Sequence, residues 1–217
     1  MKNLNNYIEH TLLKQDATKQ DFTKLFEEAK ENQFLGVCVN PCYVKLAKES
    51  LKNSNVKVVT VIGFPLGANT TKTKVFETTN AISDGADEID MVINVTKVKD
   101  RDTEFIVDEI SQIKRACEKH NLKVILETDL LTKEDIKYAC ECAIKGGADF
   151  VKTSTGFVKG GVGAKVEDVE LMYQTVKNAG LQVKASGGIR DKETAISMIK
   201  AGAVRLGTSS GVKIISD

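Results

Sequence analysis

One alternation runs the length of this sequence and limits the folds open to it. Short runs rich in β-branched residues are followed by turns and then by longer stretches with apolar residues at helical spacing. We expect eight of the short runs to form strands: residues 7–10, 35–39, 56–61, 88–92, 122–126, 149–152, 181–184 and 203–206. Strands that alternate with helices in this way indicate parallel βα units.

The number of strands and the chain length favour one architecture. The 217 residues show neither a shift in composition nor a linker, so we expect a single α/β domain over residues 1–217. Eight βα units predict a closed (β/α)8 barrel, the TIM barrel. An open, doubly wound sheet is the alternative, because the count of eight depends on the short run at 7–10.

Helix boundaries are marked by capping residues and glycines. Thr18 stands three residues before Asp21, and Thr132 three before Asp135, which predicts a capping oxygen at each helix start. Asp191 stands just before a third helical stretch. Three helices are expected to end on glycines that can adopt the left-handed conformation, in the segments 84–87, with Gly85, 146–149, with Gly146 and Gly147, and 201–203, with Gly202.

Charge and composition exclude several classes of function. Lys and Arg number 31 against 30 Asp and Glu, a formal net charge of +1, and no basic stripe or interleaved aromatic set is present. We therefore expect neither nucleic acid nor an anionic membrane surface as a partner, and any bound anion must be held by a local site.

The cysteines and the hydropathy pattern indicate a cytoplasmic protein. Residues 1–10 lack the apolar core of a secretory signal, and no stretch approaches the ~18 apolar residues of a membrane helix. The five cysteines are odd in number and form no CxxC pair, which argues against a disulfide framework or a structural zinc site. Reduced, mostly buried thiols are expected.

Three ionisable residues lie where strands are expected to end. Alternation places Asp90, Lys152 and Lys184 opposite the apolar residues of their strands. If the apolar set faces the helices, these three side chains face the barrel axis, at the end where α/β barrels carry their active sites. The competing interpretation is that the lysines reach solvent and Asp90 caps a turn.

Two lysines and a carboxylate in a partly dry interior can carry out imine chemistry. A lysine is nucleophilic only as the neutral amine, and burial beside a second cation generally favours that form. The protonated imine formed on a carbonyl carbon draws electrons from the neighbouring carbon, so C–C bonds break or form without a metal. A nearby carboxylate can move the protons.

Two glycine- and serine-rich loops follow the last two strands, at residues 185–190 and 206–211. In a barrel these loops are adjacent, and their backbone N–H groups are suited to hold a phosphate. Neither a P-loop nor a dinucleotide-binding pattern is present. The glycine-rich stretch 156–163 is instead expected to be a mobile connection.

At this point the motifs resemble a known family, deoxyribose-phosphate aldolase, from about residue 7 to about residue 212. The most specific segments are Lys-Thr-Ser-Thr-Gly at 152–156 and Lys-Ala-Ser-Gly-Gly at 184–188. Residues 8–14, 61–67 and 85–92 also match. The resemblance implies a (β/α)8 barrel and a class I aldolase that reversibly cleaves 2-deoxy-D-ribose 5-phosphate into D-glyceraldehyde 3-phosphate and acetaldehyde, in deoxyribonucleotide catabolism.

The same resemblance implies a role for each matching residue. Lys152 would form the Schiff base, Lys184 would favour its neutral amine and assist proton transfer, and Asp90 would be the acid/base carboxylate. The 5-phosphate would be held by Gly187, Gly188, Gly207, Ser209 and Ser210. Cys38 resembles a family cysteine near the substrate, although a barrel-interior thiol explains it equally well.

Two departures from the family pattern qualify these roles. Phe157 replaces a lysine that some members carry near the phosphate, so we expect backbone N–H groups to matter more here. The chain ends at Asp217 without the carboxyl-terminal tyrosine of longer members, which leaves proton exchange to Asp90, Lys184 and water.

The expected partners are a small phosphosugar, acetaldehyde and further copies of the chain in a homodimer or homotetramer. No cofactor and no metal are expected. Two alternatives stay open: a lysine-dependent aldolase for another phosphosugar, and a non-catalytic sugar-phosphate binding protein whose lysines only neutralise the ligand.

Overall fold

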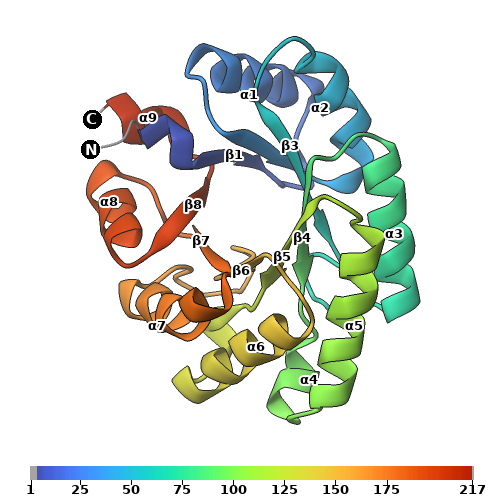
Figure 1. Cartoon of the computed structure of the whole chain (residues 1–217). Helices are drawn as coiled ribbons and strands as arrows, with labels where there is room; N and C mark the ends of the chain where they lie inside the picture. Colours follow the sequence, from blue (N-terminus) through green and yellow to red (C-terminus); the bar gives the residue numbers. More distant parts are fainter. Residues whose placement is uncertain (1–3, 217) are drawn as a thin grey trace.

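The computed structural model of the chain describes residues 4–216, and these residues form a closed barrel of eight parallel strands. Each strand pairs with its neighbours in sequence, and β1 pairs with β8 to close the sheet (Figure 1). The strands are β1 Ile8–Leu12, β2 Gly36–Val39, β3 Lys57–Ile62, β4 Glu88–Val92, β5 Asn121–Ile125, β6 Phe150–Lys152, β7 Gln182–Ser186 and β8 Ala203–Thr208. The barrel prediction is confirmed, and the doubly wound alternative is excluded because β1 bonds to both β2 and β8.

Helices surround the barrel and fill most of the connections between strands (Figure 1). The α-helices are α1 Lys19–Glu31, α2 Val44–Ser50, α3 Thr71–Ser83, α4 Val95–Lys99, α5 Thr103–Ala116, α6 Lys133–Lys145, α7 Val166–Val176, α8 Lys192–Lys200 and α9 Gly211–Ser216. Short 3-10 turns occupy η1 Leu4–Tyr7, η2 Pro41–Tyr43, η3 Thr128–Leu130 and η4 Lys177–Ala179. Residues 1–3 and Asp217 lie outside the described residues. The prediction drawn from Asp217, and the part of the prediction on residues 1–10 that concerns 1–3, therefore stay predictions.

The capping predictions are confirmed. Thr18 and Thr132 form reciprocal capping boxes with Asp21 and Asp135, and the Asp191 side chain accepts from the backbone N–H of Thr194. Three glycines take positive φ between helix and strand: Gly85 at 104°, Gly147 at 79° and Gly202 at 115°. Helix ends are therefore fixed by local chemistry, which sets where each strand begins.

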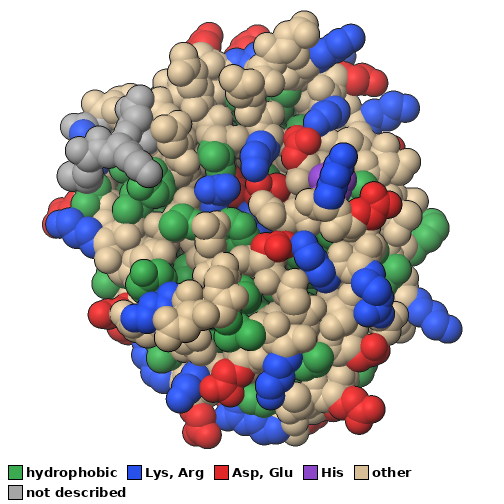
Figure 2. Space-filling view, viewed as in Figure 1, with side chains coloured by type: hydrophobic (Ala, Val, Ile, Leu, Met, Phe, Trp, Pro, Cys, Tyr) green, Lys and Arg blue, Asp and Glu red, His purple; other side chains and the backbone are tan. Residues whose placement is uncertain are grey.

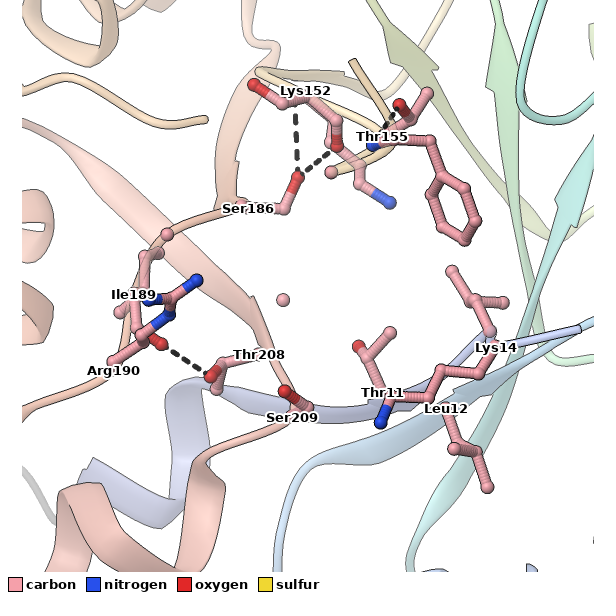
Figure 3. A pocket seen from close by; sticks show the side chains of 17 residues that line it. Thr11, Leu12, Lys14, Lys152, Thr155, Ser186, Ile189, Arg190, Thr208 and Ser209 are labelled. Atoms are coloured by element: carbon pink, nitrogen blue, oxygen red, sulfur yellow. Dashed lines mark hydrogen bonds between the residues drawn. The ribbon is translucent and has the colours of Figure 1, made fainter. Parts of the chain in front are cut away.

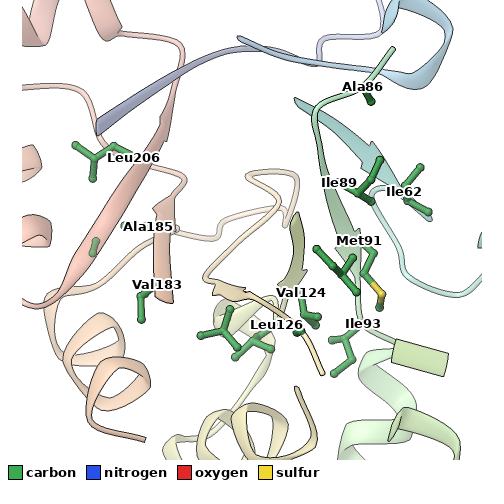
Figure 4. Close-up of a cluster of buried hydrophobic side chains, with 14 of the residues drawn as sticks. Ile62, Ala86, Ile89, Met91, Ile93, Val124, Leu126, Val183, Ala185 and Leu206 are labelled. Atoms are coloured by element: carbon green, nitrogen blue, oxygen red, sulfur yellow. The ribbon is translucent and has the colours of Figure 1, made fainter. Parts of the chain in front are cut away.

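The main core lies between the sheet and the helices. Outward-facing strand residues such as Ile89, Met91, Val124 and Val183 are fully buried there (Figure 4). Burying a side chain of this size contributes about 1.5–3 kcal/mol. Because side chains alternate along a strand, the same packing directs Asp90, between Ile89 and Met91, into the barrel.

The surface and the cysteines agree with the composition. Basic and acidic side chains are interspersed on the face seen in Figure 2. None of the helices described between residues 4 and 216 is long and apolar enough to cross a membrane. All five cysteines lie in the described range and are free thiols, and four of them are buried.

Candidate active site

The three ionisable residues singled out by alternation meet inside the barrel. Asp90 Oδ2 accepts hydrogen bonds from Lys152 Nζ at 2.8 Å and from Lys184 Nζ at 2.7 Å. Asp90 comes from β4, whereas Lys152 and Lys184 are directly opposite each other on β6 and β7. All three side chains are buried, so the interpretation that these lysines reach solvent is wrong.

Two further charged residues, which were not among the predicted site residues, extend the network. Lys123 of β5 donates to Asp90 Oδ1 at 3.0 Å, and its Nζ lies 3.6 Å from Glu9 Oε1. Glu9 of β1 also accepts from Lys184 Nζ. Lys123 lies between the apolar Leu122 and Val124, the signal that identified Asp90, whereas Glu9 lies between Ile8 and the polar His10.

The amino-terminal end of the network is closed by Glu88 of β4. Its carboxylate lies 2.6 Å from Lys123 Nζ and 2.6 Å from Lys57 Nζ. Burial opposes ionisation, yet the two lysines lower the pKa of Glu88 to about 2. Lys123 is therefore held between Glu88, Asp90 and Glu9, away from the open end of the barrel.

The network fixes the protonation of its deepest members. Burial would raise the pKa of Asp90, but Lys123, Lys152 and Lys184 hold it well below its usual range. Burial would lower the pKa of Lys184, but Asp90 and Glu9 raise it, and the same balance raises the pKa of Lys123. At neutral pH Asp90 is therefore an anion beside the cations of Lys123 and Lys184.

A cavity of about 300 Å³ opens at the carboxyl ends of the strands (Figure 3). Of the charged network described within residues 4–216, Lys152 lines this cavity, whereas Asp90 and Lys184 are buried below its floor. The Lys152 side chain is 4% exposed. An amine that faces a cavity, backed by a carboxylate and a second lysine, can attack a carbonyl and exchange protons.

The two glycine- and serine-rich loops lie side by side, as predicted, and form one wall of the cavity. The cavity is lined by Gly187 and Gly188 from the β7–α8 loop (187–191). It is also lined by Gly207, near the end of β8, and by Ser209, just after β8. The Ser210 backbone N–H, next to the cavity-lining Ser209, donates to Thr208 Oγ1 at 2.9 Å. The role of Ser210 at the phosphate stays a prediction.

Cys38 is fully buried on β2 and does not line the cavity. It packs with Leu13, Val59 and Val61 in an apolar cluster inside the barrel, away from the helix layer. Burial raises the pKa of the Cys38 thiol, although Lys184 and Lys152 oppose the shift. The structure favours the barrel-interior thiol over direct contact with a ligand.

Two cations that were not among the predicted site residues line the cavity. Arg190 lines it beside Ile189 and Ser209, and Lys14 lines it on the opposite side (Figure 3). Phe157 also lines the cavity and makes an edge-on contact with Phe64, ring centroids 5.1 Å apart. The position where some family members carry a lysine is therefore apolar here, and the positive charge comes from other elements.

The β6–α7 loop, residues 153–165, begins against a buried glutamate. Glu127, just after β5, has a left-handed φ of 62° and accepts from the Thr155 backbone N–H at 3.0 Å and from the Thr155 hydroxyl. Burial raises the pKa of Glu127, and the hydrogen bonds from Thr155 oppose that shift. Thr155 lines the cavity, so Glu127 sets its orientation from behind.

Comparisons with known proteins agree with this geometry. A family model described as DeoC/LacD family aldolase matches residues 6–217. The chain is 56% identical to a protein of Finegoldia magna named deoxyribose-phosphate aldolase, covering 98% of each chain.

Solved structures give the same result. A structure named QR15, an aldolase, is 45% identical with a TM-score of 0.94, over 100% of this chain and 96% of that one. A deoxyribose phosphate aldolase from Aeropyrum pernix, described as tetrameric, is 33% identical with a TM-score of 0.91, over 98% of this chain and 89% of that one.

Proposed function

The chain belongs to the DeoC/LacD family of aldolases and is therefore a lyase, and from this premise we propose that it reversibly cleaves 2-deoxy-D-ribose 5-phosphate into D-glyceraldehyde 3-phosphate and acetaldehyde. The observation that carries the proposal is the position of Lys152, a cavity-lining amine hydrogen-bonded to the buried carboxylate of Asp90. The name of the Finegoldia magna relative supports the choice of substrate.

The proposed reaction passes through an imine on Lys152. Nζ attacks C1 of the open-chain sugar, and loss of water gives the protonated imine. The C2–C3 bond then breaks as the C3 hydroxyl loses its proton, releasing glyceraldehyde 3-phosphate and leaving an enamine. Protonation at C2 and addition of water release acetaldehyde and regenerate the amine.

Asp90 and Lys184 move the protons that these reaction steps require. Asp90 Oδ2 is within hydrogen-bond distance of both lysine nitrogens, so a proton can pass between them through the carboxylate. The raised pKa of Lys184, caused by Asp90 and Glu9 against the effect of burial, returns Lys184 to its charged form after each transfer.

The phosphate binds at the wall formed by Gly187, Gly188, Gly207 and Ser209. Their backbone N–H groups supply donors, and Arg190 supplies a guanidinium suited to phosphate. The aldehyde end of the sugar then points toward Lys152, which lines the same cavity. A location in the cytoplasm, a role in deoxyribonucleotide catabolism and assembly as a homodimer or homotetramer belong to the same proposal.

Activity on the sugar phosphate tests the proposal. The wild-type protein should release acetaldehyde and glyceraldehyde 3-phosphate from 2-deoxy-D-ribose 5-phosphate, both measured by coupled dehydrogenases. Lys152→Met should abolish release, whereas Lys159→Met, which removes an exposed lysine from the same loop, should leave it unchanged. Full activity in Lys152→Met would overturn the proposal.

The same variants separate the two alternatives. A binding protein would bind the sugar phosphate without turnover, and Lys152→Arg would bind it as well as the wild type. An aldolase for another phosphosugar would cleave a different member of a phosphosugar panel faster than 2-deoxy-D-ribose 5-phosphate.

A further inference from the structure

The loop predicted to be a mobile connection packs directly on the wall of the cavity. Backbone meets backbone where the β6–α7 loop crosses the β7–α8 loop. The Ala164 N–H donates to the Gly187 carbonyl oxygen at 3.0 Å. A Cβ added at Gly163 would lie 2.4 Å from the Gly187 carbonyl carbon, and one at Gly188 would lie 2.3 Å from the Val162 carbonyl oxygen. The two loops are therefore in contact too close for side chains, and a shift in one displaces the other.

Asp129 holds the outer side of this contact. The residue lies in η3 after β5, and its carboxylate accepts from the Val162 N–H at 3.3 Å and from the Gly163 N–H at 2.8 Å. The same turn is tied to the β6–α7 loop by a hydrogen bond from the Thr128 N–H to the Thr153 carbonyl oxygen, at 3.0 Å. Asp129 thus fixes the position of the Val162–Gly163 segment relative to the barrel.

The contact between the loops sets the direction of a donor in the cavity wall. The peptide between Gly187 and Gly188 is trans, so its C=O and N–H point in opposite directions. Its carbonyl is directed toward Ala164, which does not line the cavity. The Gly188 N–H is therefore directed away from Ala164, and both glycines line the cavity.

We propose that Asp129 is a positioning residue for phosphate recognition, which acts through the β6–α7 loop to aim the Gly188 N–H at the phosphate of the substrate. This inference rests on the proposed function, since it takes the phosphate to bind at this wall. Asp129 touches neither the substrate nor the reacting atoms. Its carboxylate is suited to the task because each of its two oxygens accepts from one N–H of the loop.

Asp129→Asn is the most informative substitution. The amide keeps the size of the side chain but has one acceptor oxygen, and its NH2 group must face one of the two loop N–H groups. The test compares condensation of acetaldehyde with D-glyceraldehyde 3-phosphate and with unphosphorylated D-glyceraldehyde. We expect kcat/KM for the phosphorylated acceptor to fall about tenfold or more, chiefly through KM, as expected for a misplaced charge-assisted hydrogen bond.

The unphosphorylated acceptor provides the internal control. Its kcat/KM should change less than about threefold, so the preference for the phosphorylated acceptor should collapse. Inorganic phosphate should inhibit the variant more weakly than the wild type. Asp129→Glu, which restores both oxygens, should retain more of the preference than Asp129→Asn. Asp84→Asn makes the same charge change at an exposed site before β4, at the opposite end of the barrel, and should retain the preference fully.

The outcomes distinguish this inference from the proposed function. An Asp129→Asn variant that keeps the wild-type preference, or that loses activity equally on both acceptors, would overturn the positioning role and leave the aldolase proposal intact. A wild-type protein with no preference for the phosphorylated acceptor would overturn the phosphate site itself, and the positioning role with it.

Discussion

Replacing Asp90 with asparagine tests the buried charge network at its centre. The Asp90 carboxylate accepts from Lys184 at 2.7 Å, Lys152 at 2.8 Å and Lys123 at 3.0 Å. Asparagine has the same shape but no charge. Because both carboxylate oxygens are already occupied, the new NH2 group must face an ammonium group.

The expected loss of stability follows from burial. Lys123 and Lys184 are fully buried, and the substitution leaves Glu9 as the carboxylate that both still contact. Removing one partner of a buried ion pair costs about 3–5 kcal/mol. For a chain of 217 residues this corresponds to a fall in Tm on the order of 10 °C.

The pH dependence gives this prediction a distinct signature. Although burial opposes ionisation, the three lysines hold the pKa of Asp90 well below its usual range, so its ionised form stabilises the folded state above the unfolded carboxyl pKa of about 3.9. That contribution is lost as the pH falls through the lower pKa of the folded state. The stability difference between wild type and Asp90→Asn should therefore be constant from about pH 7 to 5 and shrink below about pH 4.

Urea denaturation followed by circular dichroism at several pH values measures the difference. Asp84→Asn, the exposed control, should change the free energy of unfolding by less than about 0.5 kcal/mol. If the free energy of unfolding of Asp90→Asn lies within about 1 kcal/mol of the wild-type value at pH 7, the reasoning is refuted, since removal of a buried carboxylate paired with three lysines should cost more than that. A difference that does not shrink at acidic pH would refute it as well.

Three further substitutions have expected outcomes. Lys184→Met should reduce kcat/KM about as much as Lys152→Met, and the double variant should be little worse, because residues that act as a unit are not additive; independent losses in the double variant would contradict this. Gly163→Ala introduces a side chain at a residue with φ +81°, with its Cβ 2.4 Å from the Gly187 carbonyl carbon. The free energy of unfolding should therefore fall by about 1–3 kcal/mol in thermal unfolding, and an unchanged Tm would count against the loop contact. Lys74→Met breaks a fully buried 2.8 Å pair with Glu109 outside the barrel; we expect a loss of about 3–5 kcal/mol, largely restored in Lys74→Met/Glu109→Leu, with kcat unchanged in the folded fraction.

The fold and the centre of the site could be predicted from local signals. Alternation along β4, β6 and β7 is enough to place Asp90, Lys152 and Lys184 inside the barrel, because a strand packed against helices on one face must turn its other residues inward. The capping pairs at Thr18 and Thr132 fix helix starts without any tertiary information.

Other parts of the site depend on contacts between distant segments. The Ser210 backbone N–H is bonded to the hydroxyl of Thr208, the last residue of β8, a contact that the glycine- and serine-rich composition of the loop does not reveal. The clamp of Asp129 on Val162 and Gly163 joins residues more than 30 positions apart and has no periodic signature. Glu9 escaped prediction because β1 reads Ile-Glu-His-Thr-Leu, so the polar His10 and Thr11 interrupt the apolar alternation that identifies Asp90.

Trapping of the imine is the most direct test of the central claim, that Lys152 is the nucleophile of a class I aldolase. The protein is incubated with acetaldehyde, reduced with borohydride, digested and analysed by mass spectrometry, with Lys159 on the same loop as an internal comparison. The account predicts a two-carbon adduct on Lys152 at near-stoichiometric yield and little on Lys159. An unmodified Lys152 in a fully active enzyme would contradict it.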